Sequence, residues 1–494
     1  MLWATTAFAQ SEMTINCSEP GQLSDKIGGR YEYLNRLTVT GRLGSSDIET
    51  LRCLASRDKY KTISDGKEVW KDNFFELDIS GVSCAPNNIM FPRTSHLVKI
   101  ILPVNARRIP DNAFYGCSRL IHFIAPPLIS IGNSSFEGCK NLEKFFIPKT
   151  MEHWGTNCFK DCTGLTDILI PEGLKDLPEG CLSGTKITSA YIPSTIMSIH
   201  ETAFDDCNAL KSFGVDSYNP NFMVAGPLLI DKNSMTIVGA ARAARGAVNV
   251  PEGVTKLRNK TFNSWWFDSI NLPTTIQNIE PGTFKWCGFS TIAWPDNVKE
   301  IPDGVFECSG LKDFKIPEGV TRIGNHAFHA STLTSIEIPA SVTTLGESCF
   351  QKCNFTEFTL PSTVTTFGDA ILKNSDITKI NLPDNLKYIS NEMLRDTHLT
   401  ELVIPSGVTK IGDHAFQSIK ELKTITIPAS VTEYGKKMLY GCKNLESVIV
   451  MNENPTDVEN IYNEKKAVLR VPKGCVEKYK ACKGWKKFKN IEEQ

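Results

Sequence analysis

The sequence lacks an excess of charge of either sign, and it lacks a long apolar run. Its 54 Lys and Arg residues nearly balance its 55 Asp and Glu residues, for a formal net charge of −1. A nucleic-acid partner calls for a basic stripe on the protein, so this balance argues against nucleic acid. No apolar stretch is long enough to span a bilayer, so we expect no transmembrane segment.

The sequence also lacks a motif that carries catalysis. Its eight histidines are scattered, and none belongs to a nucleophile elbow or a zinc-binding motif. Several glycines recur in step with a repeat, which makes them turn residues rather than a phosphate-binding loop: Gly324, Gly346, Gly368, Gly412 and Gly435. We therefore predict no catalytic residue, no metal ligand and no cofactor, and an enzyme ranks third among the functions considered below.

What the sequence does have is a proline that returns every 22 or 23 residues over most of the chain, each time after a short apolar segment. The series is Pro103, Pro126, Pro148, Pro171 and Pro193, then Pro251, Pro273, Pro295, Pro317, Pro339, Pro361, Pro383, Pro405 and Pro428. A fixed period of this length indicates a solenoid, in which each repeat buries its apolar face by stacking on its neighbours.

Each repeat carries the same columns of apolar residues. Side chains six, three and one positions before the proline are apolar, which predicts a short strand that the proline ends. Phe or Leu returns eleven residues after most of the prolines, and we expect this column to form the outer wall of the core. Phe74, Leu77 and Ile79 match the strand template before the first proline, and Leu445 and Val448 match it after the last.

The sixteen cysteines follow the repeat rather than a disulfide pattern. Eight lie thirteen or fourteen residues after the proline: Cys117, Cys139, Cys162, Cys207, Cys287, Cys308, Cys353 and Cys442. Other coils place Trp265 or Ser331 there, so we favour buried thiols acting as small apolar residues over bridges. The pairs Cys158/Cys162 and Cys349/Cys353 are weak metal candidates, because two structural columns already explain them.

The repeat divides the chain into four parts. Residues 1–9 read as the remnant of a signal peptide, with an A-x-A pattern before Gln10 but no basic n-region, so we expect export. Residues 10–96 form an N-terminal cap with the first repeat-like coils and a helix over 47–55. Residues 97–450 form the repeat solenoid, in which Asp216 replaces one proline and a hairpin is inserted around 216–245. Residues 451–494 cap the end, with a capping helix expected over 473–489.

The repeats resemble a known family. The segment 402–416 reads LVIPSGVTKIGDHAF, which is similar to the pattern I-x-I-P-x-x-V-x-x-I-G-x-x-A-F of the BspA-like leucine-rich repeat proteins on the surfaces of anaerobic gut and oral bacteria. The resemblance implies an α/β-type repeat solenoid, a right-handed superhelix with one short parallel strand per coil and a mostly irregular or helical-turn convex side. It also implies an adhesin or another interaction protein without a common catalytic motif.

The outward position two residues before each proline changes along the chain. In the early coils this position is apolar, and its residues are Ile101, Ile124, Phe146, Leu169 and Tyr191. Lys99, His122 and Lys144 lie two residues before Ile101, Ile124 and Phe146, respectively. In later coils it is mostly polar, with acidic neighbours such as Glu357 and Glu401. An exposed apolar strip across five coils marks a contact site. We interpret it first as a protein-binding site, second as a surface covered by the insertion or the N-terminal cap, and third as a site of self-association.

Tryptophans on adjacent coils offer a second candidate site. Trp265, Trp266 and Trp286 could stack on sugar rings, although Trp265 could instead fill the cysteine column and Trp286 cover a coil edge. We predict an exported, non-enzymatic, adhesin-like scaffold, at the cell surface, in the periplasm or secreted. It would bind a host or envelope protein through the concave sheet of its early coils, and an envelope glycan-binding module is the alternative.

Overall fold

The computed structural model describes residues 12–64, 67–72, 74–83, 89–459 and 466–494. The chain divides into two compact units, residues 1–244 and 245–494, which we describe separately. The expected signal-peptide remnant, residues 1–9, lies outside the described residues. Within the described ranges, no helix has both the length and the apolar character needed to cross a bilayer.

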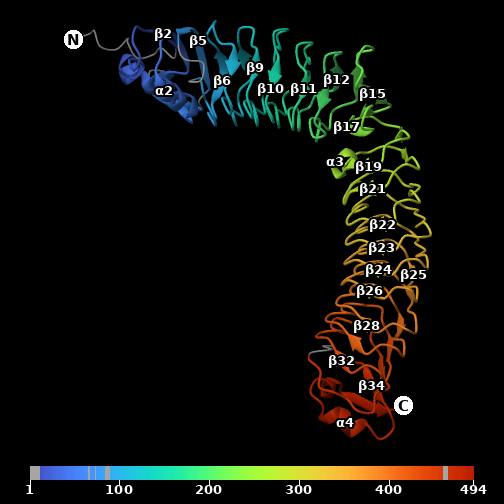
Figure 1. The fold of residues 1–494 in the computed structure, drawn as a ribbon. Coiled ribbons are helices and arrows are strands. Elements are labelled where there is room, and N and C mark those ends of the chain that lie inside the picture. The colour runs from blue at the N-terminus through green and yellow to red at the C-terminus, as the bar shows by residue number, and fades with distance from the viewer. Residues whose placement is uncertain (1–11, 65–66, 73, 84–88, 460–465) are drawn as a thin grey trace. The chain divides into compact units, whose positions relative to one another are not determined.

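Both units are parallel β-solenoids with repeats of about 23 residues, and their coils stack side by side in chain order (Figure 1). The first ladder of the N-terminal unit joins five parallel strands: β1 (Glu12–Cys17), β2 (Arg36–Arg42), β5 (Phe75–Ser83), β6 (Leu97–Ile101) and β8 (His122–Ile124). Further along, β12 (Ser189–Ile192) pairs with β14 (Ser212–Val215) in parallel. The strand template is confirmed for these strands, whereas the segments before Pro148 and Pro171 do not form strands. In addition, β1 was not predicted, and Phe75 rather than Phe74 is the buried residue of β5.

A cap and an insertion complete the N-terminal unit. The cap contains α1 (Leu23–Ile27), a 3-10 helix (Gly28–Tyr33), α2 (Ser45–Ser56) and the antiparallel pair β3 (Lys59–Ser64) and β4 (Lys67–Asp72), so the helix expected over 47–55 is confirmed. The insertion forms a three-stranded antiparallel sheet of β15 (Phe222–Ala225), β16 (Leu228–Asp231) and β17 (Thr236–Ala240).

The C-terminal unit has its own parallel strands in the corresponding position of the coil, and they form several separate sheets. Its strands are β18 (Ala247–Asn249), β20 (Ser269–Asn271), β25 (Glu357–Thr359), β27 (Lys379–Asn381), β29 (Glu401–Val403), β31 (Thr424–Ile427), β33 (Ser447–Val450), β34 (Val468–Val471) and β35 (Asn490–Glu493). Its helices are α3 (Asn259–Phe262), α4 (Val476–Ala481) and a 3-10 turn (Trp485–Lys487). The capping helix expected over 473–489 is therefore only six residues long, because the segment folds into a further coil that ends in β35.

A second parallel ladder, not predicted from the sequence, runs four to six residues after the prolines. In the N-terminal unit it comprises β7 (Arg108–Ile109), β9 (Ser130–Ile131), β10 (His153–Trp154), β11 (Asp176–Leu177) and β13 (Ser198–Ile199). In the C-terminal unit it comprises β19 (Lys256–Leu257), β21 (Asn278–Ile279), β22 (Glu300–Ile301), β23 (Arg322–Ile323), β24 (Thr344–Leu345), β26 (Thr366–Phe367), β28 (Tyr388–Ile389), β30 (Lys410–Ile411) and β32 (Glu433–Tyr434). The second residue of each pair, except Tyr434, is buried, so this ladder closes the coil from the other side.

The Phe and Cys columns form the core wall. Phe306, Phe328 and Phe350 stack in succession at ring-centroid distances of 5.4 and 5.5 Å. The column thiols are buried hydrogen-bond donors: Cys139 Sγ, for example, donates to the Phe114 carbonyl at 3.1 Å. Cys308 is the exception. In its coil the column position lies fourteen residues after the proline, and Ser309 fills it. Cys308 lies one residue earlier, with a φ of 54° and a half-buried side chain.

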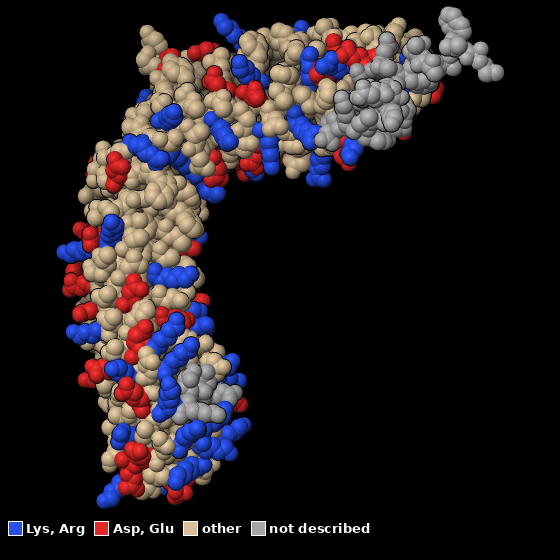
Figure 2. Space-filling view, turned by 180° about the vertical axis from the view of Figure 1, so that it is seen from behind, with Lys and Arg blue, Asp and Glu red and all other residues tan. Residues whose placement is uncertain are grey.

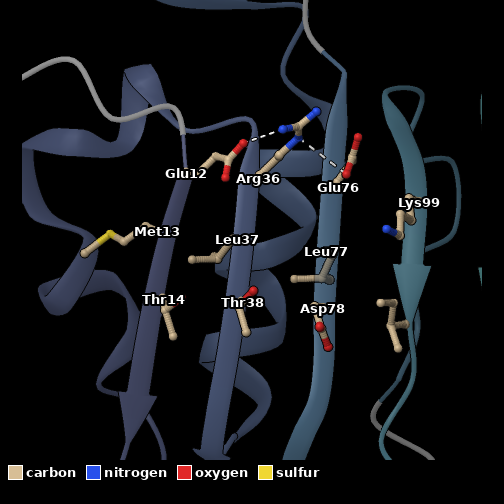
Figure 3. A pocket seen from close by; sticks show the side chains of 11 residues that line it. Glu12, Met13, Thr14, Arg36, Leu37, Thr38, Glu76, Leu77, Asp78 and Lys99 are labelled. Atoms are coloured by element: carbon tan, nitrogen blue, oxygen red, sulfur yellow. Dashed lines mark hydrogen bonds and ion pairs between the residues drawn. The ribbon is translucent and has the colours of Figure 1, made fainter.

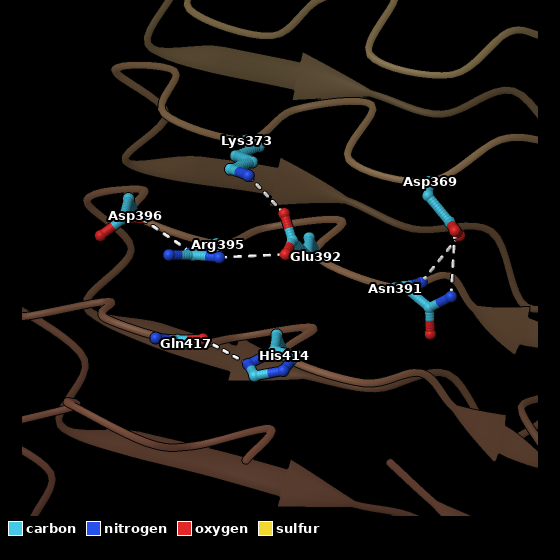
Figure 4. Close-up of polar contacts among 8 residues, drawn as sticks. All are labelled: Asp369, Lys373, Asn391, Glu392, Arg395, Asp396, His414 and Gln417. Atoms are coloured by element: carbon cyan, nitrogen blue, oxygen red, sulfur yellow. Dashed lines mark hydrogen bonds and ion pairs between the residues drawn. The ribbon is translucent and has the colours of Figure 1, made fainter. Parts of the chain in front are cut away.

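Polar side chains link successive coils of the C-terminal unit near the second ladder (Figure 4). Asp369 Oδ1 accepts the Asn391 amide at 3.1 Å, and Asn391 Oδ1 accepts the Asp413 amide at 2.8 Å. Glu392 bridges Lys373 and Arg395 in the same view. The contacts of Asp369 and Asn391 satisfy backbone donors that two-residue strands leave open.

Candidate interaction surface on the N-terminal sheet

The apolar strip, defined as Ile101, Ile124, Phe146, Leu169 and Tyr191, lies on the solvent face of the N-terminal unit. Ile124 is 47%, Phe146 87%, Leu169 65% and Tyr191 50% exposed, and Ile101 is partly buried. The residues on either side of Phe146 and Leu169 are buried, because successive side chains of an extended segment point to opposite faces. The alternation that builds the core therefore also places the strip in solvent.

None of the described residues covers the strip. The insertion at 216–245 leaves Phe146 and Leu169 more than half exposed, so the structure contradicts the interpretation in which the insertion or the cap folds over these side chains. Binding of a partner and self-association remain as interpretations.

Tyr191 closes the strip at its C-terminal end. It pairs with Gly214 across the β12–β14 ladder, and a Cβ at Gly214 would lie 2.8 Å from Tyr191 Cδ2, so the ring lies across the neighbouring strand where only glycine fits. The Tyr191 hydroxyl donates to Asp216 Oδ2 at 2.9 Å, and this hydrogen bond raises the pKa of the phenol. The ring is thus held flat on the sheet before any partner arrives.

A row of basic residues runs beside the strip. Lys99, His122 and Lys144 each precede a strip residue by two positions and share its face, and Lys99 is the ladder partner of His122. Within the described part of the chain, none of the three makes an ion pair with a carboxylate. One side of the strip is therefore lined by basic residues.

A shallow pocket of about 200 Å³ continues the surface toward the N-terminus (Figure 3). Residues of β1, β2, β5 and β6 line the pocket. Ile101 belongs to both the pocket and the strip, and Lys99 belongs to both the pocket and the row of basic residues. Arg36 lies between Glu12 and Glu76 on the flanking strands and forms an ion pair with each, while Asp78 lines the pocket nearby. Sequence reasoning missed this pocket because β1 was not recognised as a strand.

The later coils do not repeat the strip. Val403, in the same outward position of β29, is 68% exposed but pairs with the polar Thr426 across the ladder. Glu357 in this region forms an ion pair with Lys379 at 3.9 Å. On the face shown in Figure 2, acidic and basic side chains are present on both units, and basic side chains gather near the C-terminal end.

The tryptophan group does not form one platform. Trp265 is fully buried in the cysteine column, so the part of the glycan alternative that relied on it is wrong. Trp266 and Trp286 are exposed, and Trp266 lies over Gly288, where a Cβ would come within 2.5 Å of the indole. Of the three tryptophans in this group, Trp266 and Trp286 are the two whose rings could meet a sugar.

The fold is that of a repeat scaffold, and comparison with known families agrees. The BspA type leucine rich repeat region matches six copies over residues 87–211, 246–356 and 343–465, which together make up more than half of the chain. The protein belongs to this family, and the resemblance drawn from its repeats is confirmed.

Solved structures of other bacterial leucine-rich repeat proteins are similar in part. A leucine rich cell surface protein from Faecalibacterium prausnitzii A2-165 is 19% identical, with 70% of this chain and 83% of that chain covered and a TM-score of 0.39. A leucine-rich repeat protein from Bacteroides ovatus is 15% identical, with 88% and 90% covered and a TM-score of 0.33. No curated protein matches. The family assignment rests on the repeat match rather than on these superpositions.

Proposed function

We propose that this protein is a non-enzymatic, adhesin-like interaction scaffold, exported to the bacterial surface, the periplasm or the medium, that binds a protein partner through the apolar strip. The observation that carries the proposal is the exposure of four apolar side chains on successive coils, from Ile124 to Tyr191. Contiguous apolar patches of this kind are rare on monomer surfaces unless they bind something. The superhelix itself is right-handed in this proposal, as nearly all crossovers between parallel strands are.

The strip also indicates what the partner offers. Five rungs at a spacing of about 4.8 Å extend over about 19 Å, which is the length of about six residues of extended chain. Lys99, His122 and Lys144 add a row of basic residues along one side. The partner therefore presents an extended segment that combines apolar side chains with Asp or Glu.

Selection from a random peptide library displayed on phage tests this proposal with the purified full chain as bait. We expect enrichment of peptides that combine apolar and acidic residues. Phe146→Asp should weaken their binding at least tenfold. Val403→Asp is the matched control, because Val403 occupies the same outward position on the other unit, and it should change binding less than twofold.

A charge reversal tests the row of basic residues independently of the apolar strip. Lys99→Glu combined with Lys144→Glu should shift the selected peptides from acidic to basic sequences while the apolar residues are kept. The proposal fails if the enriched peptides bind Phe146→Asp as well as the wild type. Binding to a glycan array that is lost in Trp266→Ala or Trp286→Ala would instead support the glycan alternative.

A further inference from the structure

Three different metal-binding groups meet on the C-terminal unit, away from the apolar strip. Glu307, Cys308 and His329 each offer one donor atom, and these atoms lie within 4.8 Å of one another. Cys308 is available because Ser309, not Cys308, fills the buried cysteine column. All three side chains are partly buried rather than exposed.

The backbone holds the three residues in register. The Cys308 amide donates to the His329 carbonyl at 2.7 Å, so the two coils are joined by a hydrogen bond between two of the three donor residues. The flanking amides of Phe306 and Ala330 make further bonds between coils, each of 2.8 Å. Backbone hydrogen bonds between the turns of adjacent coils therefore preorganise the group.

One of the donor atoms is also unsatisfied in the way a metal ligand would be. Among the described residues, His329 Nδ1 is buried without a hydrogen-bond partner, and it faces Glu307 Oε1 at 3.8 Å. The other oxygen, Glu307 Oε2, accepts from Lys285 Nζ at 2.8 Å, which fixes the carboxylate in place. Two donors on one tetrahedral zinc ion lie about 3.3–3.6 Å apart, given the usual zinc bond lengths, so small side-chain rotations complete the site.

We propose that Glu307, Cys308 and His329 bind one divalent transition-metal ion of the zinc class. A thiolate with an imidazole selects such an ion over magnesium or calcium, which prefer oxygen ligands. The fourth position is open to water or to His326, whose ring centroid lies 5.6 Å from that of His329. Binding ties two consecutive coils together and so stabilises the folded chain.

Titration with Co²⁺, a spectroscopic substitute for zinc, tests the site in tag-free, reduced, full-length protein. We expect one equivalent to give tetrahedral visible bands and a thiolate-to-cobalt charge-transfer band. Cys308→Ser should abolish the charge-transfer band, and His329→Ala should weaken Co²⁺ binding at least tenfold. Two control variants should leave the band unchanged. Among the described cysteines, Cys53→Ser removes the exposed thiol, and Cys482→Ser removes the half-buried thiol other than Cys308.

A thermal measurement provides a second readout. Zn²⁺ should raise the unfolding midpoint of the wild type and of Cys482→Ser but not that of Cys308→Ser. The proposal is overturned if no charge-transfer band appears, or if the band survives in Cys308→Ser or disappears in Cys482→Ser.

Discussion

Phe146 and Phe328 are the same residue type in two different columns of the coil. Phe146 is 87% exposed on the outward face of its coil, whereas Phe328 is stacked between Phe306 and Phe350 in the core wall. Their positions relative to the repeat proline decide this difference, because that distance sets the face on which a side chain lies.

Replacing each phenylalanine by alanine should therefore change the free energy of unfolding to very different extents. Phe328→Ala leaves a cavity in a packed stack, and we expect a loss of about 3–5 kcal/mol in the free energy of unfolding. Phe146→Ala removes an exposed side chain and should change that free energy by less than about 0.5 kcal/mol. Urea unfolding of both variants measures the difference. Equal losses would contradict the assignment of the two columns.

The thiols divide in the same way. Burial raises the pKa of Cys117 and of Cys207 to about 11, and that of Cys353 to about 12, so their reactive thiolate forms are scarce at pH 8. Iodoacetamide at that pH should label Cys53 first and Cys308 and Cys482 more slowly, and it should spare the column until the chain is unfolded. Peptide mass spectrometry reads out each site. Rapid labelling of Cys117 in the native state would show that the column is open.

Cys308 shows where residue-level prediction failed. Cys308 lies thirteen residues after Pro295, which is the distance at which Cys139 fills the column after Pro126. In the coil of Cys308 the column lies at fourteen residues, where Ser309 is buried. A shift of one residue moves a side chain from the core to the surface, and the repeat period alone does not resolve that shift.

At the scale of the element, the glycine that follows the second ladder has a role that the sequence did not reveal. We expected Gly346 and its equivalents to serve as turn residues. In the structure, a Cβ at Gly346 would lie 2.4 Å from the Asn325 backbone nitrogen. Glycine is required there because the neighbouring coil approaches too closely for any side chain.

Gly346→Ala should consequently destabilise the chain by about 3 kcal/mol, because the new carbon meets backbone atoms that cannot move aside. Gly282→Ala is the matched control. Gly282 has φ of 71° and open space around its Cβ, so alanine there costs only the backbone strain of about 1 kcal/mol. Urea unfolding midpoints of the two variants would contradict this account if Gly282→Ala were the more damaging.

The elements that the sequence predicted best are those with a long-range period. The Phe column is found as predicted over the repeat series, and a strand precedes most of the prolines, although the segments before Pro148, Pro171, Pro295, Pro317 and Pro339 are extended without forming a strand. The second ladder was missed because its strands are only two residues long and show no alternation of their own. The Arg36 pocket was missed because β1 precedes the proline series, and pairing between distant strands is not visible in a single sequence.

At the scale of the whole molecule, each coil contacts mainly its neighbours, so a local defect should remain local. Phe328→Ala should speed amide exchange in the adjacent coils, from about residue 300 to 375, and leave the coils around residues 97–148 unchanged. Hydrogen exchange followed by mass spectrometry measures both regions in one sample. Faster exchange throughout both units would show that the solenoid unfolds as one cooperative body instead.

The most direct test of the central claim is the affinity of the full chain for its selected partner segment, compared between Phe146→Asp and Val403→Asp by titration calorimetry. Both variants place the same charge at the same outward position of a coil, so they differ only in whether the apolar strip is present. We predict at least a tenfold loss of affinity for Phe146→Asp and less than a twofold change for Val403→Asp. Unchanged affinity in Phe146→Asp would contradict the assignment of the apolar strip as the binding surface.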